Sequence, residues 1–134
     1  MSYPRELRAP GIPGEIVRLV RDLGVRLLAG DTAAHATLRE QLAVAELSRV
    51  TLTGAGFFAY LSVPPDAKRV TPPDLIGGDV GITVQGLDAA AGSLVKVKHG
   101  VLAFIEVYTN GTEAWPDHPE VISYGEASPL AVRE

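Results

Sequence analysis

The first part of the chain carries apolar residues at the spacing of an α-helix. Between residues 15 and 29 they recur at intervals of four, three and four, which places on one helical face Ile16, Val20, Leu23 and Leu27. Residues 33–45 are rich in alanine, leucine and other strong helix formers, and Asp31 or Thr32 suits the N-cap of this second helix. Because very few residues join the two segments, the sequence predicts an antiparallel helical hairpin, with a single bent helix as the alternative.

From residue 48 onwards the apolar positions alternate with polar ones, as they do in β-strands. This alternation runs over 48–63, 79–86, 94–98 and 101–109, with a short segment at 121–124. Gly54 and Gly56 interrupt the first of these segments. They predict a β-bulge or a close approach of two backbones, and not a phosphate-binding loop, because the third glycine, the Lys-Ser/Thr pair and a following helix are missing.

Turn signals separate these strands. His99-Gly100 and Asn110-Gly111 are typical of tight turns, and the prolines and glycines of 66–78 predict a long loop. Since no helix lies between the later strands, the sequence predicts an α+β fold, with the helical hairpin on one face of an antiparallel meander of about four to five strands. We expect one domain over 1–134, with an irregular arm at 1–14, a helical part at 15–47, a sheet part at 48–124 and a tail at 125–134.

Composition excludes several classes of protein. The chain has no cysteine, which rules out disulfides, thiolate metal sites and cysteine nucleophiles. Its net charge of -4 disfavours nucleic-acid binding, which usually needs a basic surface. No stretch approaches the roughly 18 apolar residues of a membrane helix. We therefore expect a cytoplasmic protein that binds neither nucleic acid nor membrane.

Glu106 is the sharpest candidate for a functional residue. Alternation along its strand places Glu106 on the same face as Leu102, Phe104 and Tyr108. If that face is buried, the pKa of the Glu106 carboxyl should rise, which would make it a candidate general acid or base. If the face is solvated, Glu106 is an ordinary polar residue, or it pairs with a lysine of the neighbouring strand.

A proline-flanked segment near the C-terminus holds two further candidates. Trp115, the only tryptophan, either anchors a protein partner or closes the end of the core. His118 lies among three carboxylates, but no second histidine is close in sequence, so we expect no metal site. His35, among alanines of the second helix, is expected at the surface, and His99 in a hairpin turn.

Several short motifs resemble a family of small uncharacterised bacterial proteins. They are Thr53-Gly54-Ala55-Gly56-Phe57-Phe58, Val63-Pro64-Pro65, Gly78-Asp79-Val80, Lys98-His99-Gly100-Val101-Leu102, Glu106-Val107-Tyr108-Thr109 and Glu113-Ala114-Trp115-Pro116. The resemblance covers roughly residues 38–116. It implies that the glycines and the Trp-Pro pair belong to a shared fold, and it supplies no activity, cofactor or catalytic residue.

No catalytic motif stands out, so we favour a non-enzymatic module that binds or regulates another protein in the bacterial cytosol, such as an immunity protein. The partner is another protein or, through a free sheet edge, a second copy of the chain. We expect no catalytic residue, no metal and no cofactor. The alternative is a small ligand-binding protein or enzyme that uses Glu106 in a pocket. The candidate binding residues are Glu106, Tyr108, Trp115 and His118.

Overall fold

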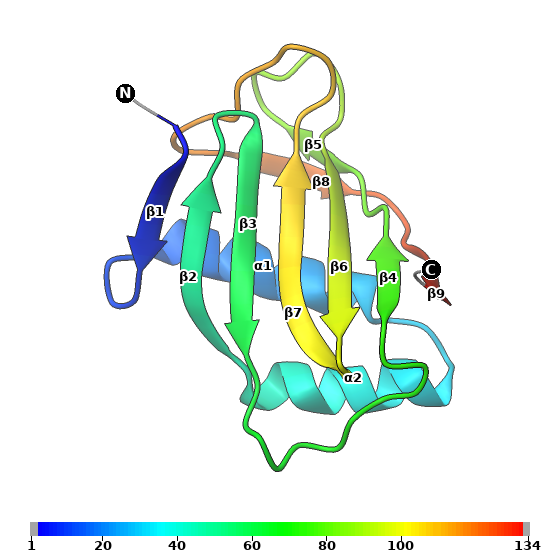
Figure 1. Cartoon of the computed structure of the whole chain (residues 1–134). Helices are drawn as coiled ribbons and strands as arrows, with labels where there is room; N and C mark the ends of the chain where they lie inside the picture. Colours follow the sequence, from blue (N-terminus) through cyan, green and yellow to red (C-terminus); the bar gives the residue numbers. More distant parts are fainter. Residues whose placement is uncertain (1–2, 133–134) are drawn as a thin grey trace.

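The computed structural model describes residues 3–132 (Figure 1). Within this range the chain forms two helices and nine strands: β1 (Arg5–Arg8), α1 (Gly14–Leu27), α2 (Ala33–Val44), β2 (Glu46–Leu52), β3 (Gly56–Ser62), β4 (Leu75–Gly78), β5 (Ile82–Val84), β6 (Gly92–Lys98), β7 (Val101–Tyr108), β8 (Val121–Tyr124) and β9 (Ser128–Val132). The extreme ends of the expected arm and tail, residues 1–2 and 133–134, lie outside the described residues.

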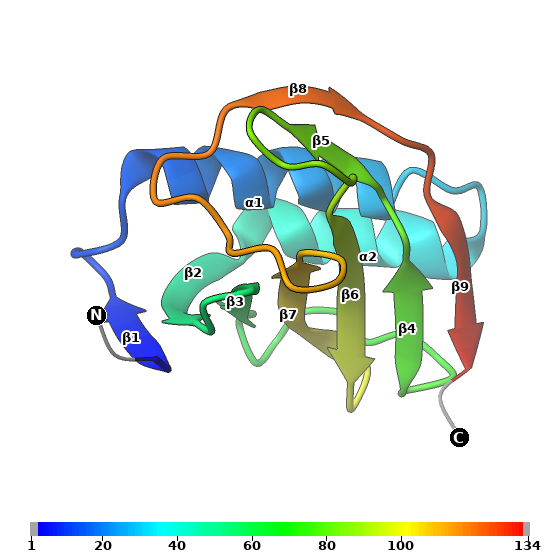
Figure 2. The ribbon, with the colours of Figure 1, turned by 90° about the horizontal axis from the view of Figure 1, so that it is seen from above.

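The fold has two main layers, a sheet and a pair of helices. Seven strands form an antiparallel sheet in the order β1-β2-β3-β7-β6-β4-β9. Both helices cross behind this sheet, so one of its faces is covered and the other is open (Figure 1). Strands β5 and β8 form a separate two-stranded ribbon on the helix side, next to α1 (Figure 2). The predicted α+β class is therefore confirmed.

The helices cover the sheet with the apolar faces that the sequence predicts. The stripe on α1 is buried at every position, namely Ile16, Val20, Leu23 and Leu27. Thr32 is the N-cap of α2, and its hydroxyl oxygen accepts the N–H of His35 at 3.1 Å. The two helices touch where Gly24 meets Leu42, since a Cβ at Gly24 would lie 2.9 Å from the leucine methyl. Each helix also packs on the central strands of the sheet. No helix in residues 3–132 is long and apolar enough to cross a membrane.

The sheet is larger than the predicted four to five strands. The expected arm contributes β1 and the expected tail contributes β9, and these two strands form the edges of the sheet. Prolines misled the prediction, because Pro129 sits in an edge strand, where a missing N–H can face solvent without breaking a ladder. The loop predicted over 66–78 is also too long, because its last residues, Leu75–Gly78, form strand β4.

The segment 48–63 is a hairpin rather than one bulged strand. Strand β2 ends at Leu52 and β3 begins at Gly56, with Gly54 in the turn at a φ of 88°. The bulge predicted for these glycines is therefore wrong. The other predicted reason for glycine, a close backbone approach, holds at Gly56, where a Cβ would overlap the carbonyl of Val107.

A β-bulge between β6 and β7 decides which side chains reach the open face. Lys96 pairs with Phe104, whereas the next residue of β6, Val97, pairs with Leu102, so that Ala103 is the extra residue of β7. The bulge turns Leu102 into the core, where only 2% of it is exposed. The prediction that Leu102 shares the face of Phe104 is wrong, because strict alternation does not survive an inserted residue.

Three polar residues of α2 are buried, namely His35, Thr37 and Gln41. His35 is only 5% exposed, contrary to the predicted surface position, and its Nδ1 lies 2.6 Å from the Thr32 hydroxyl. Burial, followed by the charge of Arg39, lowers the pKa of His35. Gln41 donates to the carbonyls of Lys68 and Gly100 and accepts the N–H of Leu102. Gln41 therefore ties the 63–74 crossing to the β6–β7 hairpin.

Candidate functional site

The four candidate residues lie at two separate places. Glu106 and Tyr108 belong to β7 and point to the open face of the sheet. Trp115 and His118 belong to the segment that leaves β7 and passes towards the start of α1 (Figure 2). The structure thus groups Glu106 with Tyr108 and Trp115 with His118, and it does not bring the two pairs into one site.

Three aromatic rings form a cluster at the centre of the open face. Phe58 and Tyr60 come from β3 and Phe104 from β7, and all three are half-buried. The Phe104 ring meets the Phe58 ring edge-on at 5.4 Å between centroids and the Tyr60 ring at 5.8 Å. The Phe58 and Tyr60 rings stack at 6.3 Å. Such geometries are favourable, so the aromatic cluster is a fixed part of this surface.

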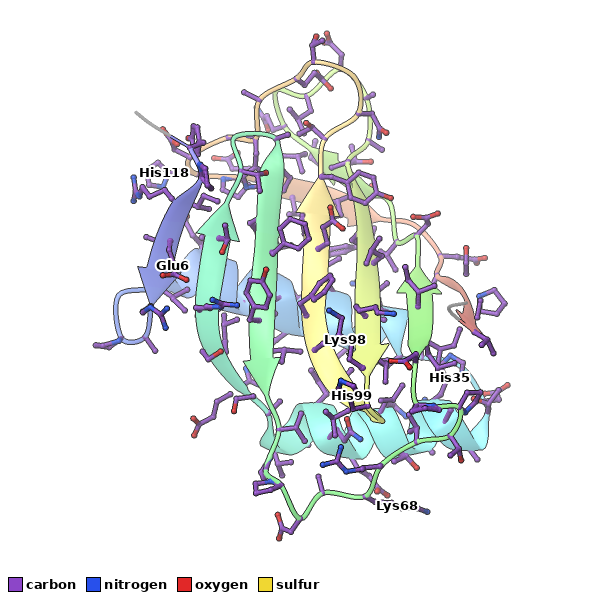
Figure 3. The ribbon with its side chains drawn as sticks, viewed as in Figure 1. Glu6, His35, Lys68, Lys98, His99 and His118 are labelled. Carbon is purple, nitrogen blue, oxygen red and sulfur yellow. The ribbon has the colours of Figure 1, made fainter. Side chains whose placement is uncertain are left out.

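Cations lie at one end of the aromatic cluster. The Arg49 guanidinium is 4.0 Å from the centre of the Tyr60 ring, and Arg49 also bonds a carboxylate oxygen of Glu6 at 3.3 Å. The Lys98 ammonium lies 5.8 Å from the Phe104 ring centre, and Figure 3 shows Lys98 on the open face near the β6–β7 turn. These cations already have aromatic or carboxylate partners.

Glu106 lies at the opposite end of the aromatic cluster, among apolar neighbours. Its cross-strand partners are Phe58 on β3 and Leu94 on β6, and Phe104 and Tyr108 flank it along β7. Glu106 forms no hydrogen bond or ion pair with any residue in the range 3–132, so the pairing with a lysine is not seen. Burial raises the pKa of the Glu106 carboxyl. The predicted burial-driven shift is therefore present on a face that the helices leave open.

Tyr108, which lies next to Glu106 on β7, is held by the carboxylate of Asp79. Its hydroxyl donates to Oδ1 of Asp79 at 2.8 Å. Burial first, then Asp79 and Glu106, raise the pKa of Tyr108 to about 12. Its ring lies over Gly92, where a Cβ would overlap it. Tyr108 consequently remains protonated near neutral pH and acts there as a hydrogen-bond donor.

Trp115 closes one end of the core. Its ring meets the buried Phe57 ring edge-on, with 5.8 Å between centroids, and its backbone N–H donates to the Gly54 carbonyl at 2.9 Å. The side chain is half-buried and packs against the core cluster. Of the two roles that the sequence left open, these contacts favour the structural one.

His118 and Trp115 line a cavity on the helix side of the molecule. The cavity has a volume of about 260 Å³ and lies between β1, the first turn of α1 and residues 115–119. Its walls include Tyr3, Leu7 and Ile16. The exposed His118 closes one side, with Nδ1 2.9 Å from a carboxylate oxygen of Glu15. Glu106 does not line this cavity.

A second, more open cavity of about 570 Å³ lies between the α1–α2 connection and residues 125–129. Within residues 3–132, no group of three or more histidine, aspartate and glutamate side chains is arranged to hold a metal ion. The two cavities and the open face are the larger surfaces that the described residues offer to ligands or partners.

The aromatic cluster is a surface feature that the sequence did not predict. Phe58 and Tyr60 were visible as alternating positions, and so was Phe104. Their meeting depends on the pairing of β3 with β7, two strands that are far apart in the chain. No local pattern carries that information.

Comparison of the chain with protein-family models, with curated proteins and with solved structures found no match. The resemblance to small uncharacterised bacterial proteins therefore stays a prediction.

Proposed function

We propose that this chain is a non-enzymatic protein-binding module whose partner docks on the open face of the seven-stranded sheet. The observation that supports this proposal is the aromatic cluster of Phe58, Tyr60 and Phe104 on a face that no helix covers. An antiparallel sheet with one solvated face usually carries polar residues there. Aromatic residues are instead enriched where proteins meet, and they contribute much of the binding energy.

The chemistry of this face suits binding better than catalysis. Tyr108 is protonated near neutral pH, because its pKa is about 12. Glu106 has no hydrogen-bonded hydroxyl, amine or imidazole within the described residues that it could activate as a base. A module of this kind acts by covering a surface of its partner, as regulators and immunity proteins do.

The test is an affinity purification with three immobilised baits from a lysate of cells that express the protein naturally. The baits are the wild type, the double variant Phe58→Thr, Phe104→Thr and the control Val25→Ser. Threonine keeps a high β-propensity, so the sheet should still form, which circular dichroism checks. Val25 is 63% exposed on α1, away from the open face.

We expect a protein that the wild type and the Val25→Ser control retain in stoichiometric amount and that the double variant loses. Equal retention by all three baits, or recovery of no stoichiometric partner, would refute docking on this face.

A second candidate function is the binding of a small ligand in the cavity next to Trp115. The supporting observation is its volume of about 260 Å³ together with its aromatic and apolar walls. A fragment screen by ligand-detected NMR tests this function. The fragments that bind should lose their signal with Leu7→Phe, which fills the cavity from β1. Binding that Leu7→Phe leaves unchanged would place the fragments elsewhere.

A further inference from the structure

We infer that the protein docking on the open face places an arginine or lysine side chain, arginine by preference, against Glu106 in the position between Phe58 and Leu94. The inference rests on the proposed function and names the chemical group that the face recognises. It follows from the charge and the neighbours of Glu106, taken in three steps below.

The first step is that no positively charged side chain neighbours the Glu106 carboxyl directly across the strands or along β7. The positions directly across from it hold Phe58 and Leu94, and the positions beside it along β7 hold Phe104 and Tyr108. None of these side chains is a cation, and burial raises the pKa of the carboxyl. A carboxylate that has lost part of its water is stabilised by any cation that reaches it. The position is therefore complementary to a positive group.

The second step is that no cation in residues 3–132 is paired with Glu106, although three lie on this face. Arg49 lies on the Tyr60 ring and bonds Glu6, and Lys98 lies above the Phe104 ring. Lys96 pairs across the strands with Phe104, diagonal to Glu106, and forms no ion pair with it. The surface is thus positive at one end of the aromatic cluster and negative at the other, and the negative end has an unpaired carboxyl.

The third step concerns the shape of the missing group. Phe58 and Leu94 offer an aromatic and an aliphatic wall on the two sides of the carboxyl. A long aliphatic stem can lie along such walls while its charged end reaches the carboxylate. A guanidinium stacks on an aromatic ring and donates two parallel hydrogen bonds to a carboxylate, which is why arginine fits better than lysine.

Other charged partners fit this position less well. A divalent cation needs several oxygen ligands, and the two residues across from Glu106, Phe58 and Leu94, offer carbon atoms instead. A nucleic acid would bring phosphates towards Glu106 and Asp79, which repel them. The observations therefore favour a basic side chain of a protein.

The test uses a matched pair of peptides and the 15N-labelled full chain. The probe is acetyl-Leu-Arg-Leu-amide, and its control is the same peptide with citrulline, which replaces the guanidinium by a neutral urea of the same shape. We expect the arginine peptide to produce saturable shifts at the backbone amides of Phe58, Leu94 and Glu106. The citrulline peptide should bind about ten- to a hundredfold more weakly, as expected for the loss of a charge-assisted hydrogen bond.

A matched pair of variants assigns the effect to one carboxyl. Glu106→Gln keeps the shape of the side chain and removes a charge that burial disfavours, so the variant should fold. It should bind the two peptides equally. The control Glu126→Gln removes an exposed carboxylate outside the sheet and should keep the preference for arginine.

Three outcomes would overturn the inference. Equal binding of both peptides by the wild type would remove the guanidinium from the recognised group. Saturable shifts of the same amides with a ten-nucleotide oligothymidylate would assign the face to nucleic acid. Dimerisation of the free protein that Glu106→Gln abolishes would assign the cation to a second copy of this chain instead of a different protein.

The same variant separates this inference from the proposed function. A partner that is lost with Phe58→Thr, Phe104→Thr but retained with full affinity by Glu106→Gln would leave the docking face correct and the cation at Glu106 wrong. A partner that neither variant affects would refute both.

Discussion

Substitution of Gln41 by leucine should strongly destabilise the protein. Gln41 is 2% exposed and makes three hydrogen bonds: Nε2 donates to the carbonyls of Lys68 at 2.8 Å and Gly100 at 3.0 Å, and Oε1 accepts the N–H of Leu102 at 2.9 Å. Leucine fills a similar volume, so little of the effect arises from a cavity. The change removes all three hydrogen bonds and leaves the N–H of Leu102 buried without this acceptor.

The size of the effect follows from these bonds. The two bonds that Gln41 donates contribute about 1 kcal/mol each net, and the buried Leu102 N–H left without its acceptor costs about 1–3 kcal/mol, so the free energy of unfolding should fall by roughly 3–5 kcal/mol. Since the total stability of a domain is only about 5–15 kcal/mol, this is a large fraction of it. For a chain of this length the midpoint of thermal unfolding should fall by roughly 10 °C or more.

Urea denaturation followed by circular dichroism measures this change. The midpoint should fall while the slope with urea concentration stays the same, because the surface exposed on unfolding is unchanged. Glu40→Leu, at the neighbouring exposed position of α2, is the control and should change stability by less than about 0.5 kcal/mol. If Gln41→Leu proves as mild as this control, the three hydrogen bonds do not hold the 63–74 crossing to the β6–β7 hairpin.

Three further variants test the two candidate sites. Burial raises the pKa of Glu106 in the folded protein above 4.5, so the stability of the wild type should fall as the pH rises from 4.5 through that raised pKa. Glu106→Gln should not show this loss. Thermal midpoints of the two proteins, measured across this pH range, test the difference. Asp79→Asn should lower the pKa of Tyr108 from about 12 while burial keeps it above 10, which an NMR titration of the Tyr108 ring would show. Trp115→Ala should lower the free energy of unfolding by about 2–3 kcal/mol in urea denaturation, because it uncovers Phe57; a change below about 1 kcal/mol would mean that Trp115 does not close the core.

Local patterns were enough to predict the two helical segments and four of the nine strands in residues 3–132, namely β5, β6, β7 and β8. The stripe of Ile16, Val20, Leu23 and Leu27 depends only on the period of the helix, and all four residues are buried as expected. The His99-Gly100 turn likewise depends on local conformation, and both residues have a positive φ. Such features are written within a few neighbouring residues, so the sequence alone reveals them.

The features that the sequence did not predict depend on contacts between distant segments. Strand β1 exists because Arg5–Arg8 pair with β2, some 40 residues further along the chain. Three of its four residues are exposed and charged, so their local pattern does not indicate a strand. His35 is buried because its ring packs against Gly30 of the α1–α2 connection, although its sequence neighbours are alanines. The side of the sheet to which Leu102 points depends on one inserted residue, Ala103. The effect of this residue on the alternation of β7 becomes visible only when β6 and β7 are paired.

The candidate site was predicted in part. Alternation correctly placed Glu106 with Phe104 and Tyr108 on one face. Whether helices cover that face depends on the layer arrangement, which alternation does not contain. The pairing of Phe58 with Glu106 needs the order of strands in the sheet. The sequence therefore identified the carboxyl, and the fold supplied its neighbours.

The open sheet face around Glu106 and the segment that carries Trp115 are connected through the first residues of β3. Phe57 points into the core and supports the Trp115 ring, whereas the next residue, Phe58, points to the open face and lies across from Glu106. Loss of Trp115 should therefore loosen the strand that carries the docking face without removing any group that the partner touches. Its effect on partner binding should appear only near the temperature at which the variant unfolds, whereas Glu106→Gln should weaken binding at every temperature at which the protein is folded. A loss of binding by the stably folded Trp115→Ala variant would instead show that Trp115 itself contacts the partner.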